Sequence, residues 1–130
     1  MARVLIVEDN PANMKLATFL LQSAGHTVLS ATDAEAGLTL ARVEQPNLIL
    51  MDIQLPGMDG LEAIVLLKQD DATRAIPVIV LTALAMKGDE ERIRAAGCDG
   101  YIAKPMRYQD FLTTIAAQLA SVTGAIPWKY

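Results

Sequence analysis

Five short, apolar runs rich in branched residues alternate with segments of helical spacing along this chain of 130 residues. Each run has the length of a β-strand and is apolar nearly throughout, which is typical of parallel strands buried on both faces. Five repeats of strand then helix predict an α/β fold, a doubly wound five-stranded parallel sheet with right-handed crossovers. The runs cover residues 4–7, 27–30, 48–51, 78–81 and 101–103.

The segments between the runs carry helix signals. Asn10 offers an N-cap, Pro11 suits the first helical position, and Gly25 supplies a stop. Asp33 and Asp59 precede the second and third helical segments, and we expect them to act as caps.

The fourth helical segment, from about residue 86 to residue 96, has the thinnest apolar stripe. Its large apolar residues are Met86 and Ile93, whereas six residues from Tyr108 to Val122 line the last helix. Because apolar burial contributes roughly 25 cal/mol per Å2, we expect the fourth helix to be the more weakly anchored and the more able to shift.

Composition excludes several classes of protein. Lys and Arg number 11 against 15 Asp and Glu, and no basic run occurs, which argues against nucleic-acid binding. The single cysteine, Cys98, excludes an intramolecular disulfide. The first residues lack the pattern of a signal peptide, and no apolar run approaches the roughly 20 residues that span a bilayer. We therefore expect a cytoplasmic protein without membrane insertion.

Polar residues stand just past the ends of the predicted strands. In a doubly wound sheet, ligands collect outside the carboxyl ends of the strands, where these side chains are expected to meet. The set contains three carboxylates, a hydroxyl and an amine: Glu8, Asp9, Asp52, Thr82 and Lys104.

Three carboxylates that converge need a cation. One pair at about 4 Å repels by roughly 4 kcal/mol at an effective dielectric near 20. Mg2+ suits a site of carboxylates, waters and phosphate oxygens. Glu8, Asp9 and Asp52 contribute −3, the ion +2 and Lys104 +1, so the occupied site is formally neutral. Asp52 follows the central strand and is the best candidate for a nucleophile that attacks phosphorus.

Four longer stretches resemble the receiver domain of two-component response regulators, from about residue 3 to residue 122. The resemblance implies a flavodoxin-like (βα)5 receiver domain with strand order 2-1-3-4-5 over residues 1–122 and a separate tail over residues 123–130. NMKL (13–16) and AMKGDEERIR (85–94) further resemble single-domain cell-division regulators of that family. The four stretches are VLIVEDN (4–10), LILMDIQLPGMDG (48–60), IPVIVLTA (76–83) and GCDGYIAKP (97–105).

The resemblance also implies a role for each site residue. It makes Asp52 the phosphoacceptor and Asp9 a direct ligand of Mg2+, with Glu8 reaching the ion through water. The backbone carbonyl of Gln54 is the third protein ligand in the family.

The remaining roles concern the response to phosphorylation. Thr82 is expected to hydrogen-bond the phosphoryl oxygens and Lys104 to pair with them, with a cis bond before Pro105. Tyr101 occupies the switch position, and it is expected to fill the space that Thr82 vacates while the fourth helix repacks.

The function implied is a stand-alone regulator in cell-cycle or division control. A histidine kinase or histidine phosphotransfer protein donates the phosphoryl group in a Mg2+-dependent reaction, and the product binds a downstream protein target. We expect a monomer or weak dimer that catalyses only its own phosphorylation and dephosphorylation. Leu84 cannot orient an attacking water, which predicts a long-lived phosphoryl state.

Two alternatives stay open. A metal-dependent phosphatase of small phosphoesters would also use Asp52 as a nucleophile, but such enzymes usually carry a second acid where this chain has Gln54, and they usually need a cap. A scaffold that is never phosphorylated is disfavoured by intact Asp52, Thr82 and Lys104.

Overall fold

The computed structural model describes residues 2–82, 87–104 and 107–120. Five strands and five helices alternate along these residues. The strands form one parallel sheet of order β2-β1-β3-β4-β5, which confirms the predicted topology. The strands are β1 (Arg3–Val7), β2 (Thr27–Ala31), β3 (Leu48–Asp52), β4 (Val78–Thr82) and β5 (Gly100–Ala103). The helices are α1 (Pro11–Ser23), α2 (Ala34–Glu44), α3 (Gly60–Gln69), α4 (Lys87–Ala95) and α5 (Tyr108–Ala120).

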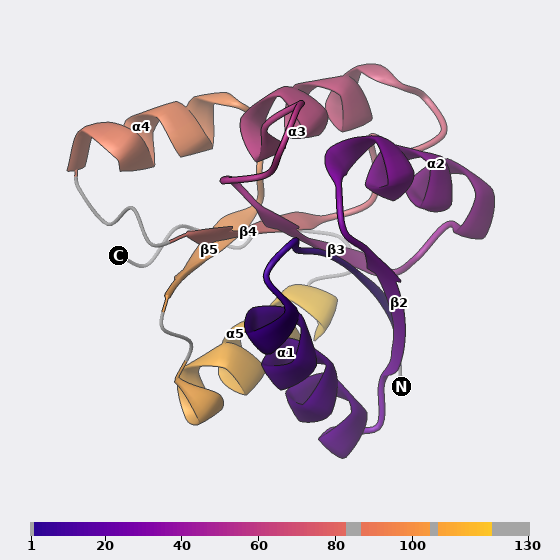
Figure 1. The fold of residues 1–130 in the computed structure, drawn as a ribbon, viewed down its shortest axis with the longest axis vertical. Coiled ribbons are helices and arrows are strands. Elements are labelled where there is room, and N and C mark those ends of the chain that lie inside the picture. The colour runs from indigo at the N-terminus through magenta and orange to yellow at the C-terminus, as the bar shows by residue number, and fades with distance from the viewer. Residues whose placement is uncertain (1, 83–86, 105–106, 121–130) are drawn as a thin grey trace.

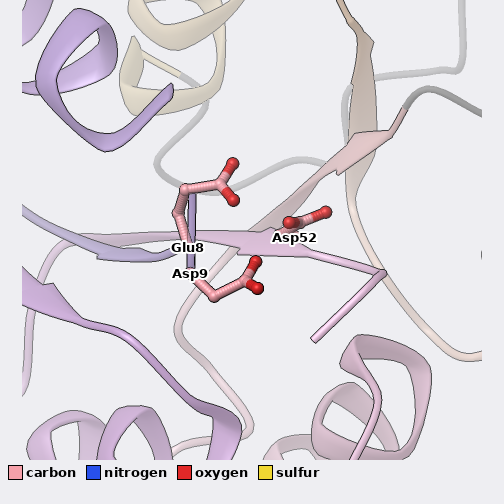
Figure 2. Close-up of side chains that lie close together, drawn as sticks. All are labelled: Glu8, Asp9 and Asp52. Atoms are coloured by element: carbon pink, nitrogen blue, oxygen red, sulfur yellow. The ribbon is translucent and has the colours of Figure 1, made fainter. Parts of the chain in front are cut away.

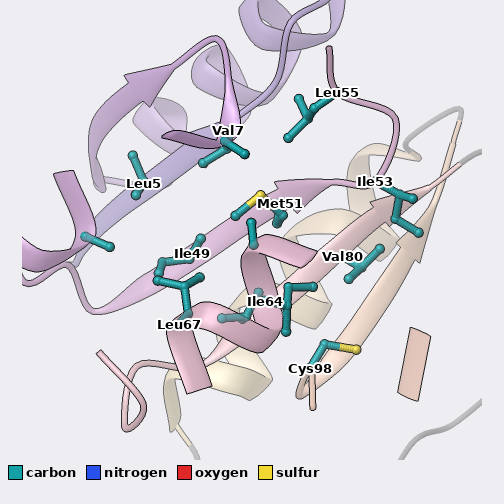
Figure 3. Packing of buried hydrophobic residues seen from close by; sticks show 14 of the residues in the cluster. Leu5, Val7, Ile49, Met51, Ile53, Leu55, Ile64, Leu67, Val80 and Cys98 are labelled. Atoms are coloured by element: carbon teal, nitrogen blue, oxygen red, sulfur yellow. The ribbon is translucent and has the colours of Figure 1, made fainter. Parts of the chain in front are cut away.

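Helices cover both faces of the sheet, as Figure 1 shows: α1 and α5 lie on one face, and α2, α3 and α4 lie on the other. Alternate residues of a strand point to opposite faces. In β1, Val4 and Ile6 join the apolar cluster beneath α1 and α5, whereas Leu5 and Val7 join the cluster beneath the other three helices (Figure 3). Both faces are buried, which explains why the strands are apolar nearly throughout.

Each strand extends one residue beyond its predicted run. In two strands the added residue is polar and lies at the carboxyl end: Asp52 is the last residue of β3, and Thr82 is the last residue of β4. Both were predicted to lie just after a strand. The backbone ladder does not depend on side-chain polarity, so it continues through them and fixes both residues in the sheet.

The predicted N-caps are confirmed. The side chains of Asn10, Asp33 and Asp59 each accept a hydrogen bond from the backbone N–H three residues later, at 2.8–3.0 Å. These caps fix where α1, α2 and α3 begin, and α1 and α3 begin close to the carboxyl edge of the sheet. No helix in the described residues is long and apolar enough to cross a membrane.

The helices α4 and α5 differ in how they are anchored. Among the α4 side chains that the structure describes, residues 91–95, Ile93 alone is buried. In α5, Phe111 and Ile115 are fully buried. Tyr108 was expected to line this helix, but it is the first helical residue and is 59% exposed.

A lysine and an aspartate close the amino edge of the sheet. The ammonium of Lys68 in α3 donates to Asp99 Oδ2 at 3.2 Å and to the carbonyls of Arg74 and Ile76 at 3.2 and 3.0 Å. Asp99 Oδ2 also accepts from the backbone N–H of Val78 at 2.8 Å. One cation and one anion are therefore paired there, and they join α3 to the starts of β4 and β5.

Candidate functional site

Three carboxylates meet at the carboxyl edge of the sheet. Glu8 and Asp9 follow β1, and Asp52 ends the adjacent strand β3. Figure 2 shows the three side chains grouped at this edge, and one oxygen of each lies within 4.8 Å of the others. Parallel strands end together, so topology alone brings residues 43 or more positions apart into one cluster.

Burial differs sharply within the cluster. Glu8 is 1% exposed and Asp52 is 4% exposed, whereas Asp9 lies exposed at the rim. Two carboxylates removed from water repel more strongly than exposed ones, because less solvent screens them. The exposed Asp9 leaves one side of the group accessible from solvent.

Among the described residues, one lysine faces the two buried carboxylates. The ammonium of Lys104, which follows β5, lies 2.8 Å from Glu8 Oε1 and 3.3 Å from Asp52 Oδ2. Glu8 Oε2 also accepts from the backbone N–H of Asn10 at 3.1 Å. Lys104 was predicted to lie at this edge and to pair with a phosphoryl group. The closer contact of its ammonium with Glu8 was not predicted from the sequence.

The pKa values of the buried pair move in opposite directions. Burial, a hydrogen bond with Glu8 and repulsion from Glu8 outweigh Lys104 and raise the pKa of Asp52 to about 6. Burial also works to raise the pKa of Glu8, but hydrogen bonds from Asp52, Lys104 and Asn10 outweigh it and lower that pKa. Without a second cation the cluster is short of positive charge, and Asp52 is the member that takes up a proton.

Backbone hydrogen bonds hold the residues after Asp52. The N–H of Gln54 donates to Asp52 Oδ1 at 3.2 Å, and the N–H of Ile53 donates to the Leu81 carbonyl of β4 at 3.4 Å. These contacts tie the orientation of the Asp52 carboxylate to the short segment that contains Gln54.

Thr82 and Tyr101 lie on one face of neighbouring strands. Parallel pairing places Val80 opposite Tyr101 and Thr82 opposite Ala103. Val80 and the half-buried Tyr101 both belong to the packing beneath α3 and α4, and Thr82 points to the same face two residues after Val80. Thr82 is 1% exposed. A buried threonine and a partly buried tyrosine thus share one face of the sheet on neighbouring strands.

Several expectations fall on residues that the structure does not describe. Leu84, Met86, Pro105, Val122 and the tail over residues 123–130 lie outside the described ranges.

One neighbour of the site escaped the sequence analysis. Gly60 opens α3 and lies so close to the end of β3 that a Cβ atom there would overlap the carbonyl oxygen of Asp52. The available signal was a glycine directly after the cap Asp59, which also fits an ordinary helix start.

Comparisons with known proteins agree with this geometry. The profile of the family described as the response regulator receiver domain matches residues 4–116. The chain is 52% identical over 116 residues to the polar-differentiation response regulator DivK of Brucella anthropi. The aligned residues cover 89% of this chain and 94% of that protein. The DivK of Brucella ovis is 51% identical over the same length.

Solved structures are similar as well. A response regulator from Chloroflexus aurantiacus superposes with a TM-score of 0.88 at 28% identity, over 92% of this chain and 98% of that one. The receiver domain of a sensor histidine kinase from Pseudomonas aeruginosa has a TM-score of 0.86 at 32% identity, with the same coverage. The crystal structure of that second protein contains a magnesium ion coordinated in its active-site cleft.

Proposed function

We propose that this chain, which belongs to the family of response regulator receiver domains, accepts a phosphoryl group on Asp52 and signals through phosphorylation-dependent protein binding. The observation that carries the proposal is the cluster of carboxylates, two of them buried, which one lysine faces among the described residues. A balanced pair would hold the fold at lower electrostatic cost, so an unbalanced cluster suits the binding of a cation and a phosphoryl group.

The donor is a phosphohistidine of a histidine kinase or histidine phosphotransfer protein. The Asp52 carboxylate attacks phosphorus, the bond between phosphorus and the imidazole nitrogen breaks, and the imidazole leaves with that electron pair and takes up a proton. The product is an acyl phosphate on Asp52. Burial of the carboxylate between β1 and β4 holds it in place for in-line attack and limits the access of competing water.

Mg2+ fits the donor set of this site. Asp9, Asp52 and the backbone carbonyl of Gln54 would hold the ion, with Glu8 reaching it through water, and hard carboxylate and carbonyl oxygens are the ligands it prefers. When bound, the ion supplies the positive charge that offsets the phosphoryl oxygens. The magnesium in the Pseudomonas aeruginosa receiver domain supports this assignment.

Phosphorylation would redirect the partners of Lys104 and Thr82. The new group adds about one negative charge and three acceptor oxygens beside the ammonium of Lys104. Lys104 then pairs with a phosphoryl oxygen, the Thr82 hydroxyl donates to another, and Tyr101 moves into the space that Thr82 leaves. Because Ile93 is the only buried side chain in the described part of α4, this helix is the element expected to shift.

The output is a changed surface that a downstream protein target binds. The similarity to DivK supports a role in cell-cycle or division control. We further propose a cytoplasmic monomer or weak dimer that does not bind nucleic acid, with a receiver domain over residues 1–122 and a tail over residues 123–130.

Transfer of radiolabelled phosphate from a phosphorylated histidine donor tests the proposal. We expect label on the wild-type chain only when Mg2+ is present, and none on Asp52→Ala. Asp71→Ala is the matched control, because it removes a surface aspartate and should label like the wild type. Equal labelling of Asp52→Ala would overturn the proposal, and many turnovers of a small phosphoester would favour the phosphatase alternative.

A further inference from the structure

Gly60 lies where helix α3 touches the backbone of the proposed phosphoacceptor. Its N–H donates to the carbonyl of Ile53 at 2.9 Å. A Cβ atom on Gly60 would overlap the carbonyl oxygen of Asp52 and lie 2.8 Å from the Cα of Ile53. The three nearest atoms all belong to the backbone, so no side-chain rotation would relieve the overlap with them.

Glycine is required at this position because there is no room for a Cβ atom, and not because of the backbone conformation. The residues with positive φ among those described are Gly25, Gln45, Gly57 and Gly97, so Gly60 has an ordinary φ that any residue adopts. Within helices alanine is favoured over glycine by about 0.5–1 kcal/mol, which makes the absence of a side chain here unfavourable for α3 by itself. The close approach to β3 is what the glycine permits.

The peptide after Asp52 is held from two sides. The N–H of Ile53 donates to the carbonyl of Leu81 in β4, and the carbonyl of Ile53 accepts from the N–H groups of both Leu55 and Gly60. The start of α3 therefore closes a small frame of backbone hydrogen bonds around the residue that links Asp52 to Gln54.

We propose that Gly60 is a positioning residue for the cation and phosphoryl site. By seating the first turn of α3 directly on β3, it fixes the direction of the Asp52 carboxylate and of the segment that carries the Gln54 carbonyl. Gly60 touches neither the ion nor the phosphoryl group and acts through Asp52 and Ile53. The inference rests on the proposed function of Asp52.

Two other glycines provide controls. A Cβ on Gly37 of α2 would lie 2.6 Å from Cγ2 of Val7, but that atom is the end of a side chain. A Cβ on Gly100 of β5 would meet no atom within 4 Å. Gly37→Ala thus tests a clash that loosens helix packing, and Gly100→Ala tests the loss of a glycine alone.

The experiment measures Mg2+ binding and thermal unfolding in the full chain. Titration of the metal-free protein with Mg2+, followed by amide resonances in 1H–15N NMR spectra, gives the dissociation constant of each variant. We expect Gly60→Ala to weaken Mg2+ binding about tenfold or more, as supporting groups of metal ligands commonly do. Its amide resonances at residues 52–54 should already differ before metal is added. Gly37→Ala should lower the melting temperature at unchanged Mg2+ affinity, and Gly100→Ala should change neither.

A second set of three variants tests the inference if Gly60→Ala does not fold. Asp59→Ala removes the cap that holds the first turn of α3, whereas Asp59→Asn keeps a capping side chain and removes only the charge. Asp33→Ala removes the equivalent cap of α2. We expect weaker Mg2+ binding in Asp59→Ala and wild-type affinity in the other two.

The outcomes separate the inference from the proposed function. Wild-type Mg2+ affinity in folded Gly60→Ala, or in Asp59→Ala if the former does not fold, would overturn the role of Gly60 and leave the proposed function intact. Failure of the wild-type chain itself to bind Mg2+ would instead overturn the proposed function.

Discussion

Two lysine–carboxylate groups lie at opposite edges of the same sheet and differ in their charge balance. At the amino edge, Lys68 pairs with Asp99, and every partner of its ammonium is within 3.2 Å. At the carboxyl edge, Lys104 is shared by Glu8 and Asp52, with a further carboxylate, Asp9, beside them. The first group is formally neutral, and the second has a formal charge of −2 when all three carboxylates are ionised (−3 from the carboxylates, +1 from the lysine).

The difference shows how one fold uses the same residue types for two purposes. A neutral pair whose charged groups form hydrogen bonds adds stability. Because its charges cancel, it does not attract a further ion. A buried group with excess negative charge lowers stability until a cation arrives, and functional sites commonly contain such groups. Matched substitutions at the two edges should therefore differ in their effects on phosphoryl transfer, Mg2+ binding and stability.

Replacing each lysine by methionine should give the largest difference in effect between the two edges. Lys104→Met removes the charge that faces the phosphoryl group, so we expect the rate of phosphoryl transfer to fall about 10²–10³-fold, as when one preorganised donor is removed from an active site. Lys68→Met should transfer at the wild-type rate. Rapid-quench assays with a phosphorylated histidine donor measure the two transfer rates. Equal rates for the two variants would contradict a role in phosphoryl transfer that belongs to the carboxyl edge alone.

Addition of Mg2+ should stabilise the protein through the carboxyl edge alone. At a concentration one hundred times the dissociation constant, binding to the folded state adds about 2.7 kcal/mol to the free energy of unfolding. Lys68→Met should keep this increment, and Asp52→Ala should lose most of it. Urea unfolding with and without Mg2+ checks the prediction, and an undiminished increment in Asp52→Ala would place the ion elsewhere.

Removal of the amino-edge pair should cost stability and nothing else. Lys68→Met keeps the aliphatic stem but deletes the hydrogen bonds of the ammonium, so we expect about 2 kcal/mol less stability, in the range for hydrogen bonds to charged groups. Its Mg2+ affinity should match that of the wild type. Unfolding by urea gives the first quantity and calorimetric titration the second, and a stability loss accompanied by weaker Mg2+ binding would show that the edges are coupled.

The smallest of these effects should be the change in the free energy of unfolding with pH. The pKa of Asp52 rises from its usual 3.8 to about 6 on folding, so the metal-free folded state holds a proton that the unfolded state has released. Asp52 therefore contributes stability at low pH that is lost as pH rises through about 6. The lowered pKa of Glu8 acts oppositely, adding stability above its usual 4.5 that is lost as pH falls.

Asp52→Asn isolates this contribution. It should abolish the loss of stability with rising pH and make the metal-free protein more stable than the wild type above pH 6. Asp99→Asn, at the balanced edge, should keep the wild-type slope. Urea unfolding across this pH interval, with a chelator present, provides the data, and a wild-type slope in Asp52→Asn would assign the titration to another group.

The sequence was sufficient for the features that follow from topology. Apolar runs without alternation predict parallel strands with both faces buried, and parallel strands bring Asp9, Asp52 and Lys104 to one edge wherever they lie in the chain. The exact ends of the strands were harder to predict, because the backbone hydrogen bonds of the sheet continue through the polar residues Asp52 and Thr82.

Contacts that depend on how the elements pack in three dimensions could not be predicted from the sequence. Lys68 and Asp99 belong to no periodic pattern, and their pairing depends on how the turns before β4 and β5 approach α3. The same holds for Gly60, whose closeness to Asp52 arises from the packing of α3 on β3. Which carboxylate holds Lys104 most closely is likewise decided by side-chain geometry that no spacing encodes.

Identification of the residue that carries phosphate tests the central claim most directly. The chain would be phosphorylated by a histidine donor with Mg2+, the acyl phosphate reduced with borohydride, and the modified position found by mass spectrometry. The account predicts a single modified aspartate at position 52. Modification at Asp9 or at the balanced Asp99, or none at all after efficient transfer of label, would contradict it.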